Sequence, residues 1–365
     1  MTMEFDWILF LTTIAVSVFG LVAVYSATRS LGSGSDIIVQ CAAWGIGVVF
    51  LFFACFFDYE QFKPVIKYVA AACLLMLVAV LILGSVGKWG SKSWIRLGAV
   101  SIQPSEFVKI GFILTFSYHL SQVKEKINKP VMLLLLAVHA VTPILLILLQ
   151  PDMGSALVFV FIFAVMLFCA KLSYKYIFPA IGILIVAMPS AYAFLLNPVQ
   201  QKRIQIFFNP ESEALGAGYN VIQSKIAIGG GGLFGKGYLS GTQNQMGYLP
   251  AKETDFIFST ICEEWGFIGG VLLIVALFLI IYRCFKISTK ADNLFGRYIC
   301  AGVGAMLLFH TVENVGMCMG LLPVTGIPLP FISYGGSSMV TNFISVGLVM
   351  SVAYHNKPRG IFEVY

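Results

Sequence analysis

The chain has 365 residues, of which 59% are hydrophobic and 11% are charged, and its mean hydropathy is +0.90. Soluble domains carry about 25% charged residues, so this composition excludes a soluble enzyme, a disordered protein and a nucleic-acid binder with a basic face. The net charge of +6 is modest for this length. Many runs reach the roughly 20 apolar residues that cross a bilayer, which predicts an all-α polytopic membrane protein.

Apolar runs between Gly, Pro and charged residues predict ten transmembrane helices in one domain, residues 1–365. The N-terminal residues Met1 to Trp7 lack the basic region of a signal peptide, so the first run is predicted to be an uncleaved helix. A long loop, 198–255, separates the seventh and eighth helices. The ten predicted spans are 7–27, 37–57, 65–85, 104–121, 130–149, 152–170, 175–197, 256–283, 296–321 and 337–355.

Basic residues predict that both termini are cytoplasmic. With the N-terminus inside, the inner loops and the tail hold 13 Lys and Arg residues, whereas the short outer loops hold 4. This is the asymmetry expected from the positive-inside rule, to which long loops contribute little. The 198–255 loop is therefore predicted to be extracellular.

Cysteine and histidine residues give no sign of a disulfide framework or a zinc site. The eight cysteines lie in or beside apolar runs with no metal-binding spacing, which is typical of small buried hydrophobes. The four histidines are scattered along the chain.

The fourth span begins with an unusual pair of charges. Glu106 and Lys109 are three residues apart and share a helix face about one turn deep, which fits an internal salt bridge. Charges inside a span are costly and usually face a cavity, so a phosphate held by Lys109 and oriented by Glu106 is favoured here. Arg96, in the preceding outer loop, could add charge, although alone it is typical of an interfacial anchor.

Two aspartates stand at the starts of later spans. Asp152 follows Pro151, and Asp255 follows Thr254, each directly before an apolar run. By position alone a helix N-cap is the better interpretation of both. The functional alternative is an outward-facing carboxylate that takes a proton from a hydroxyl group.

The long loop before Asp255 contains a glycine run. Residues 230–236 match G-x-x-x-x-G-K, but Gly237 follows where Ser or Thr is required and no strand precedes it, so a nucleotide site is rejected. The run is instead predicted to be a flexible outer segment whose backbone can approach a ligand or the membrane surface. With its amphipathic stretch at 219–228, the loop is predicted to form an external lid or site wall.

The eighth and ninth spans carry polar faces. Asp255, Ser259 and Glu263 recur every four residues beside Glu264, and this stripe could line a groove or pack against another helix. In the ninth span His310, Glu313 and Asn314 also share a face. A structural hydrogen-bonded network is the favoured interpretation there, with a proton relay as the alternative.

Four even-numbered helices are predicted to open at the outer face with the most polar sequence in the chain. Helix N-termini present unpaired N–H groups and a partial positive charge, so together they could seat a phosphate or pyrophosphate. The four ends are 103–109, 150–152, 254–255 and 333–338, the last including Ser337.

Taken together, these segments resemble the SEDS family (shape, elongation, division and sporulation), from the first span to the last. Gly241-Thr-Gln-Asn-Gln and Gly326-Ile-Pro-Leu-Pro resemble its elongation members more than its division members. The motifs that carry the resemblance are Trp94-Ile-Arg-Leu-Gly, Ile102-Gln-Pro-Ser-Glu-Phe-Val-Lys, Gln150-Pro-Asp-Met-Gly, Asn209-Pro-Glu with Gly216-Ala-Gly-Tyr, Gln223-Ser-Lys-Ile-Ala-Ile-Gly, Thr254-Asp-Phe-Ile-Phe with Glu263-Glu-Trp-Gly, and Ser333-Tyr-Gly-Gly-Ser-Ser.

The resemblance implies a peptidoglycan glycosyltransferase that polymerises lipid II at the outer face of the bacterial cytoplasmic membrane, in cell elongation and shape maintenance. It also implies a class B penicillin-binding protein and other elongation-complex membrane proteins as partners. Asp255 matches the family's essential aspartate and is expected to be the base. Lys109, Arg96, Arg203 and the helix ends would neutralise the leaving pyrophosphate, with Mg²⁺ or Mn²⁺ as a candidate cofactor.

Two other functions stay open at this point. A lipid II flippase would need a polar path to both leaflets and commonly shows repeated halves, whereas here the polar residues cluster at the outer ends and no repeat is found. A non-catalytic scaffold of the cell-wall synthase would leave Asp255 as a mere cap.

Overall fold

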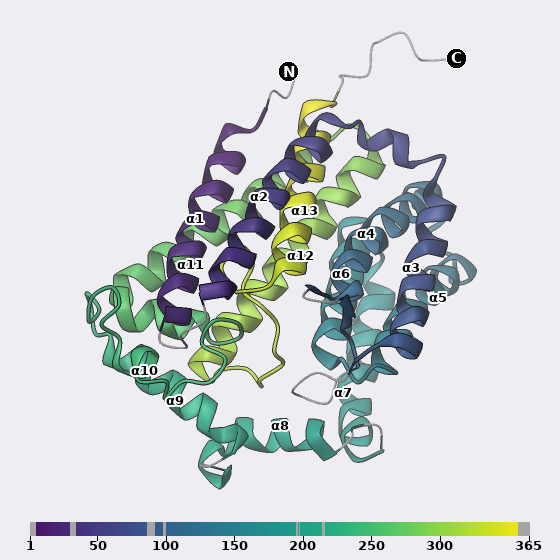
Figure 1. Ribbon diagram of the computed structural model, residues 1–365. Coiled ribbons are helices and arrows are strands. Elements are labelled where there is room, and N and C mark those ends of the chain that lie inside the picture. The colour runs from purple at the N-terminus through teal and green to yellow at the C-terminus, as the bar shows by residue number, and fades with distance from the viewer. Residues whose placement is uncertain are drawn as a thin grey trace.

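The computed structural model describes residues 5–29, 34–85, 92–97, 100–194, 196, 198–213 and 216–356. Lys88, Lys357 and Arg359, which contributed to the predicted orientation, lie outside these ranges. The described residues form a helical bundle with one short β-hairpin (Figure 1). The N-terminal elements are α1 (Trp7–Arg29), α2 (Gly34–Phe56), the 3₁₀ helix η1 (Tyr59–Phe62), α3 (Ile66–Leu83), β1 (Ile95–Leu97), β2 (Val100–Ile102), α4 (Pro104–Val123), η2 (Lys124–Lys126), α5 (Pro130–Leu148), α6 (Met153–Cys169) and α7 (Tyr174–Phe194).

The segment between the seventh and eighth predicted spans is not a structureless loop. It contains α8 (Pro198–Phe208), η3 (Pro210–Glu213), α9 (Ala217–Gly230) and α10 (Thr242–Gln245), followed by α11 (Ile257–Lys290), α12 (Leu294–Met319) and α13 (Gly336–Tyr354). In Figure 1, α8, α9 and α10 lie at the bottom of the bundle, whereas α1 begins and α13 ends at the top.

A helix lies at each of the ten predicted spans. In the described part of the chain, seven of these helices are both long and apolar enough to cross a membrane, and α6 and α7 contain shorter apolar stretches. Because α4 carries Glu106 and Lys109 near its start, it is not among the seven. The polytopic, all-α class is therefore confirmed, and the number of membrane crossings stays a prediction.

Helices α12 and α13 form the centre of the bundle. In each of them 78% of the most apolar window is buried, against 22% in α3 and α5, which lie at the outside of the bundle. α13 packs along α2, and α12 packs against α4, α6 and α11. The side chains of α12 and α13 are therefore shielded from lipid by other helices, so polar groups on them can be tolerated at membrane depth.

Local sequence sets the helix ends that shape the site. Pro104 occupies the first turn of α4, where its missing N–H costs nothing. The Asp152 carboxylate accepts from the Ser155 amide at 3.0 Å and caps α6. Gly320, with φ of 71°, ends α12 in the left-handed conformation that glycine tolerates best. The chain can therefore turn sharply into residues 321–335, which pass across the bundle to α13.

Candidate functional site

The four polar helix ends singled out in the sequence come together at one side of the bundle. The side-chain amide of Gln103 donates to the Asp152 carboxylate at 3.2 Å, and the backbone amide of Gln103 donates to the Ser337 hydroxyl at 3.3 Å. These two bonds join the starts of α4, α6 and α13. The Tyr334 amide donates to the Glu253 carbonyl at 2.8 Å, which ties the start of α13 to the turn before α11.

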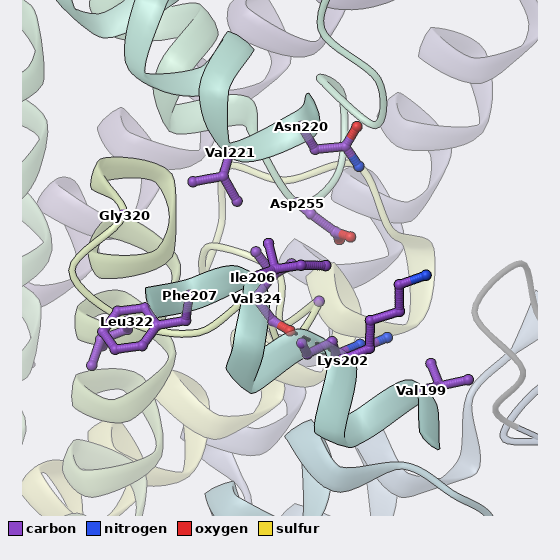
Figure 2. Close-up of a pocket in the computed structure, with 12 residues that line it drawn as sticks. Val199, Lys202, Ile206, Phe207, Asn220, Val221, Asp255, Gly320, Leu322 and Val324 are labelled. Carbon is purple, nitrogen blue, oxygen red and sulfur yellow. Dashed lines mark hydrogen bonds between the residues drawn. The ribbon is translucent and has the colours of Figure 1, made fainter. Parts of the chain in front are cut away.

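A pocket opens beside Asp255, in the turn that precedes α11. It holds about 690 Å³ of empty space including its open mouth, and its walls come from α8, α9 and residues 320–326. Figure 2 shows the side chains of Asp255, Asn220 and Lys202 directed into the same space. The remaining wall is largely apolar and comprises Val199, Ile206, Phe207, Val221, Leu322 and Val324, with Arg203, Gly320 and Gly326.

Asp255 does not cap α11. The N-cap residue is Phe256, which makes no side-chain capping bond. The Asp255 carboxyl is instead partly buried beside the pocket, and burial raises its pKa to about 6, against the lowering effect of the nearby Arg203. The helix-cap interpretation of this residue is therefore wrong, because Asp255 lies one residue before the N-cap position.

Gly326 lies beside the carboxyl in a backbone conformation that favours glycine. A Cβ built on Gly326 would lie 3.5 Å from Asp255 Oδ2, and its φ of 79° is a conformation that other residues rarely adopt. The backbone carbonyl of Asp255 is held from the other side, where the Asn314 amide of α12 donates to it at 2.9 Å. The turn is thus fixed between α12 and the 320–335 loop.

Arg203 brings positive charge from α8 to this carboxyl. Its guanidinium donates to the carbonyls of Val324 and Thr325 at 3.4 and 3.3 Å. Burial lowers the pKa of Arg203, and the negative charges of Asp255 and Asp152 oppose that effect. Arg203 therefore lies between the pocket carboxyl and the capped start of α6.

Lys202 and Glu313 also belong to this region, although the sequence analysis did not assign them to the site. Lys202 lines the pocket and forms an ion pair with Glu213. Glu313 of α12 is 4% exposed, lies within electrostatic range of Asp255 and Arg203, and lies beside the Thr325 hydroxyl. His310 and Asn314 make hydrogen bonds of the kind predicted for this face of α12.

Glu106 and Lys109 form an internal salt bridge, the alternative to the favoured phosphate site, and the phosphate role of Lys109 stays a prediction. Lys109 Nζ lies 2.8 Å from Glu106 Oε1 and 2.9 Å from His310 Nε2, and His310 Nδ1 lies 3.2 Å from the Pro328 carbonyl. Since a carbonyl can only accept, His310 donates from Nδ1 and accepts from Lys109 at Nε2. This network is buried below the helix ends and does not line the Asp255 pocket.

Breaking this buried pair is expected to destabilise the fold. Lys109→Met leaves the Glu106 carboxylate without its counter-charge in a protein interior, a change that costs about 3–5 kcal/mol. Thermal unfolding of the purified protein in detergent should show a clearly lower Tm, and adding Glu106→Gln to Lys109→Met should restore most of the loss. An unchanged Tm for Lys109→Met alone would show that the pair contributes nothing to stability.

Arg96 is not brought to the pocket. It is exposed on β1, opposite Ser101 of β2, and does not line the cavity beside Asp255. A candidate metal ion also lacks a cage here, since the described residues contain no group of three or more His, Cys, Asp or Glu side chains that could hold one. A Mg²⁺ or Mn²⁺ ion would therefore need ligands from the substrate phosphates and water besides those of the protein.

Of the predicted polar stripe, Ser259 and Glu263 on α11 pack against the preceding segment, whereas Asp255 lines the pocket. Ser259 Oγ lies 2.6 Å from Ser224 Oγ of α9, and the Glu263 carboxylate pairs with Lys236 at 2.9 Å. The glycine run is packed as well: a Cβ on Gly231 would lie 1.9 Å from the Cys262 carbonyl oxygen. The run is therefore packed rather than flexible, because α11 lies against this backbone, and its outer location stays a prediction.

Comparisons with known proteins agree with this geometry. Residues 6–358 match the family described as cell cycle protein, FtsW/RodA/SpoVE. The peptidoglycan glycosyltransferase RodA of Treponema pallidum is 34% identical, with 96% of this chain and 97% of the relative covered. The peptidoglycan glycosyltransferase MrdB of Escherichia coli K12 is 38% identical over 82% of this chain and 80% of the relative.

A solved structure matches over nearly the full length. It is a chain from a study of the structural coordination of polymerization and crosslinking by a peptidoglycan synthase complex. The TM-score is 0.83 at 32% identity, covering 96% of this chain and 97% of the other. Relatives named as probable FtsW match at 34–35% identity, close to the values for RodA and MrdB, so overall similarity does not separate the two branches.

Proposed function

The chain belongs to the FtsW/RodA/SpoVE family of cell cycle proteins and is a peptidoglycan glycosyltransferase, and we propose that it joins lipid II units with Asp255 as the general base. The observation that carries this assignment is the partly buried Asp255 carboxyl, which faces a pocket and lies near Arg203. A carboxyl with a pKa near the working pH can both accept and release a proton.

The proposed reaction is an inverting glycosyl transfer. Asp255 takes the proton of the 4-hydroxyl of the acceptor GlcNAc, and the oxygen attacks the anomeric carbon of the donor MurNAc. The bond from that carbon to the phosphate oxygen breaks, its electron pair leaves with undecaprenyl pyrophosphate, and the configuration inverts. Because pyrophosphate is a good leaving group once its charge is neutralised, no second acid is required.

Positive charge for the leaving group comes first from Arg203. Lys202 shares the pocket wall with it, and the joined starts of α4, α6 and α13 add helix-dipole charge near Asp152 and Ser337. In this proposal Lys109 and Glu106 lie deeper in the bundle than those helix ends and support them. The ammonium of Lys109 adds positive charge on the protein side of the pyrophosphate. Arg96, exposed on the hairpin, attracts the headgroup from the surface.

The multi-pass membrane location follows from the apolar helices and the family. We place the pocket at the outer face of the bacterial cytoplasmic membrane, because α8–α10 lie at the end of the bundle opposite the start of α1 (Figure 1). The 198–255 segment then forms an extracellular wall of the site within a single domain. A class B penicillin-binding protein is the proposed crosslinking partner, and the synthase complex of the structural relative supports it.

The deciding experiment incubates the purified protein and its class B partner with lipid II in liposomes while transpeptidation is blocked. Glycan ladders on a gel are expected with the complex and absent without this chain. Transfer of labelled lipid II between leaflets without ladders would favour the flippase, and ladders that do not require this chain's active residues would favour the scaffold. Elongation rather than division is tested by depletion, which should give round cells rather than filaments.

The pH dependence of the reaction should report Asp255. The base must be ionised, so kcat/KM is expected to fall below about pH 6, with a slope of one, and to reach a plateau above it. Stability should change with pH in the opposite direction to activity. Folding raises the pKa of Asp255 from 3.8, so ionising this carboxyl costs the folded state free energy as the pH rises through about 6. The pH below which kcat/KM falls is called the acid limit here, and an acid limit near pH 4 would contradict a buried base.

A further inference from the structure

Helix α11 is interrupted inside the bundle. Gly266 has φ of 68° and ψ of −166°, which are not helical angles, so the helix consists of two halves, 257–265 and 267–290. Asp255 lies two residues before the first half. An interruption at this depth leaves backbone N–H and C=O groups without their usual partners, which membrane proteins tolerate only where other protein groups bind them.

The glycine run supplies those partners. Four hydrogen bonds of 2.8–3.2 Å bridge the interruption. They run from the Lys236 amide to the Glu263 carbonyl, from the Gly237 amide to the Glu264 carbonyl, from the Phe267 amide to the Gly232 carbonyl and from the Ile268 amide to the Leu233 carbonyl. Only glycine permits so close an approach, since a Cβ on Gly235 would lie 2.1 Å from the Glu264 carbonyl oxygen.

The segment that follows the glycine run contacts α1 some distance before the end of that helix. The Tyr238 hydroxyl donates to the Val22 carbonyl of α1 at 3.3 Å, and Val22 lies seven residues before the end of α1 at Arg29. At 1.5 Å per residue that is about 10 Å along the helix. The Tyr238 side chain therefore contacts α1 away from its end, and the preceding glycine run supplies backbone hydrogen bonds at the interruption of α11.

Two buried glutamates connect α11 to the short helix α10. The Glu263 carboxylate accepts from the Gln243 amide at 2.8 Å and the Asn244 amide at 3.0 Å. Glu264 Oε1 accepts from the Ser26 hydroxyl of α1 at 2.5 Å and from Asn244 Nδ2 at 2.9 Å. Asn244 is fully buried at this junction of α1, α10 and α11.

The connection continues to the catalytic turn. The ammonium group of Lys252, which is 1% exposed, donates to the Asn244 carbonyl, and the Lys252 carbonyl accepts from the Thr260 hydroxyl at 3.5 Å. Lys252 lies three residues before Asp255, and the Phe256 amide closes the turn on the Ala251 carbonyl at 3.1 Å. A continuous buried path thus joins α1 to the turn that carries the base.

We propose that Asn244 and Glu264 are positioning residues for Asp255: with Ser26 and Lys252 they fix the turn 251–256 and the first half of α11 against α1. This inference rests on the proposed role of Asp255. Because the regular helix is interrupted at Gly266, the first half of α11 is oriented by these side-chain bonds together with the backbone hydrogen bonds to the glycine run.

The test compares Asn244→Ala with Gln243→Ala, a neighbour on α10 whose contribution to the junction is its backbone amide. Asn244→Ala is expected to reduce kcat about 10- to 100-fold with little change in KM, because small displacements of a catalytic group carry losses of this size. Hydrogen–deuterium exchange of the amides in 251–256 should accelerate while α12 and α13 keep their protection. Glu264→Gln, which keeps an acceptor at Oε1, should retain more activity than Glu264→Ala.

The acid limit of kcat/KM gives a readout that simple destabilisation would not move. Loosening the turn should let water reach Asp255 and shift that limit below pH 6. The charged groups that face Asp255 are Arg203 and Lys202 of α8, Glu253 of the same turn and Glu313 of α12, and the variant changes none of them.

Two results for Asn244→Ala would overturn the inference. One is hydrogen–deuterium exchange in 251–256 no faster than in Gln243→Ala, and the other is faster exchange together with the kcat and pH profile of the wild type. The exchange measurement needs no activity, so it judges the buried path even if Asp255→Asn proves fully active and the proposed function itself fails.

Discussion

Asp255→Asn is expected to abolish glycan polymerisation by the purified complex, a loss of at least about 10²–10⁴-fold. The amide has nearly the shape of the carboxyl but cannot accept the proton of the attacking hydroxyl. Ladder formation from lipid II, followed with transpeptidation blocked, measures the effect. Binding of the class B partner should be unchanged, which copurification would show.

Stability provides the control for Asp255→Asn. Since burial raises the pKa of Asp255 to about 6, its ionised form costs the folded state free energy at pH 7.5, and the neutral amide removes that cost. The variant should therefore unfold at the same temperature as the wild type or a higher one. Wild-type ladders from Asp255→Asn would refute this residue as the base, and an inactive variant with a much lower Tm would not support it.

Arg203→Gln is expected to give the second largest loss, about 10²–10³-fold in kcat/KM at neutral pH. It removes the positive charge that faces Asp255 and Asp152 and two hydrogen bonds to the 320–335 loop. Because Arg203 lowers the pKa of Asp255, its removal should also move the acid limit of the profile to a pH above 6. A full pH profile of lipid II polymerisation measures both effects.

Arg203→Lys separates charge from geometry. The ammonium keeps the charge near Asp255, so the acid limit should stay near the wild-type value, whereas the planar fork that reaches both carbonyls is lost. We expect an intermediate rate. If Arg203→Gln leaves the acid limit where it was, Arg203 does not act on Asp255, and its place in the proposed mechanism fails.

The fold class could be predicted because hydrophobicity is a local property. A run of apolar residues long enough to cross the bilayer forms a helix wherever it lies in the chain, since its backbone groups have no other partners in lipid. For this reason a helix was found at each predicted span, from α1 to α13. The capping role of Asp152 was predictable for the same reason, because a cap bonds within its own first turn.

The residue types of the site were visible in sequence, but their grouping was not. Asp255 and Arg203 are 52 positions apart, and the pocket exists only because α8 packs beside residues 320–326. His310 was predicted to belong to a network on α12, whereas its partner Lys109 comes from α4. Glu313 shares a helix face with His310 but lies near a different set of groups. Residues one turn apart on a helix can contact different neighbouring elements.

The sequence by itself determined the membrane class, the helices, the family and the small set of polar residues from which the site is built. These depend on composition, local hydrogen bonding and short motifs. The tertiary structure alone decided that Asp255 is a partly buried carboxyl instead of a cap, that Arg96 stays outside, and that a glycine run completes an interrupted α11. Each of these depends on contacts between segments far apart in the chain, which the order of residues does not specify locally.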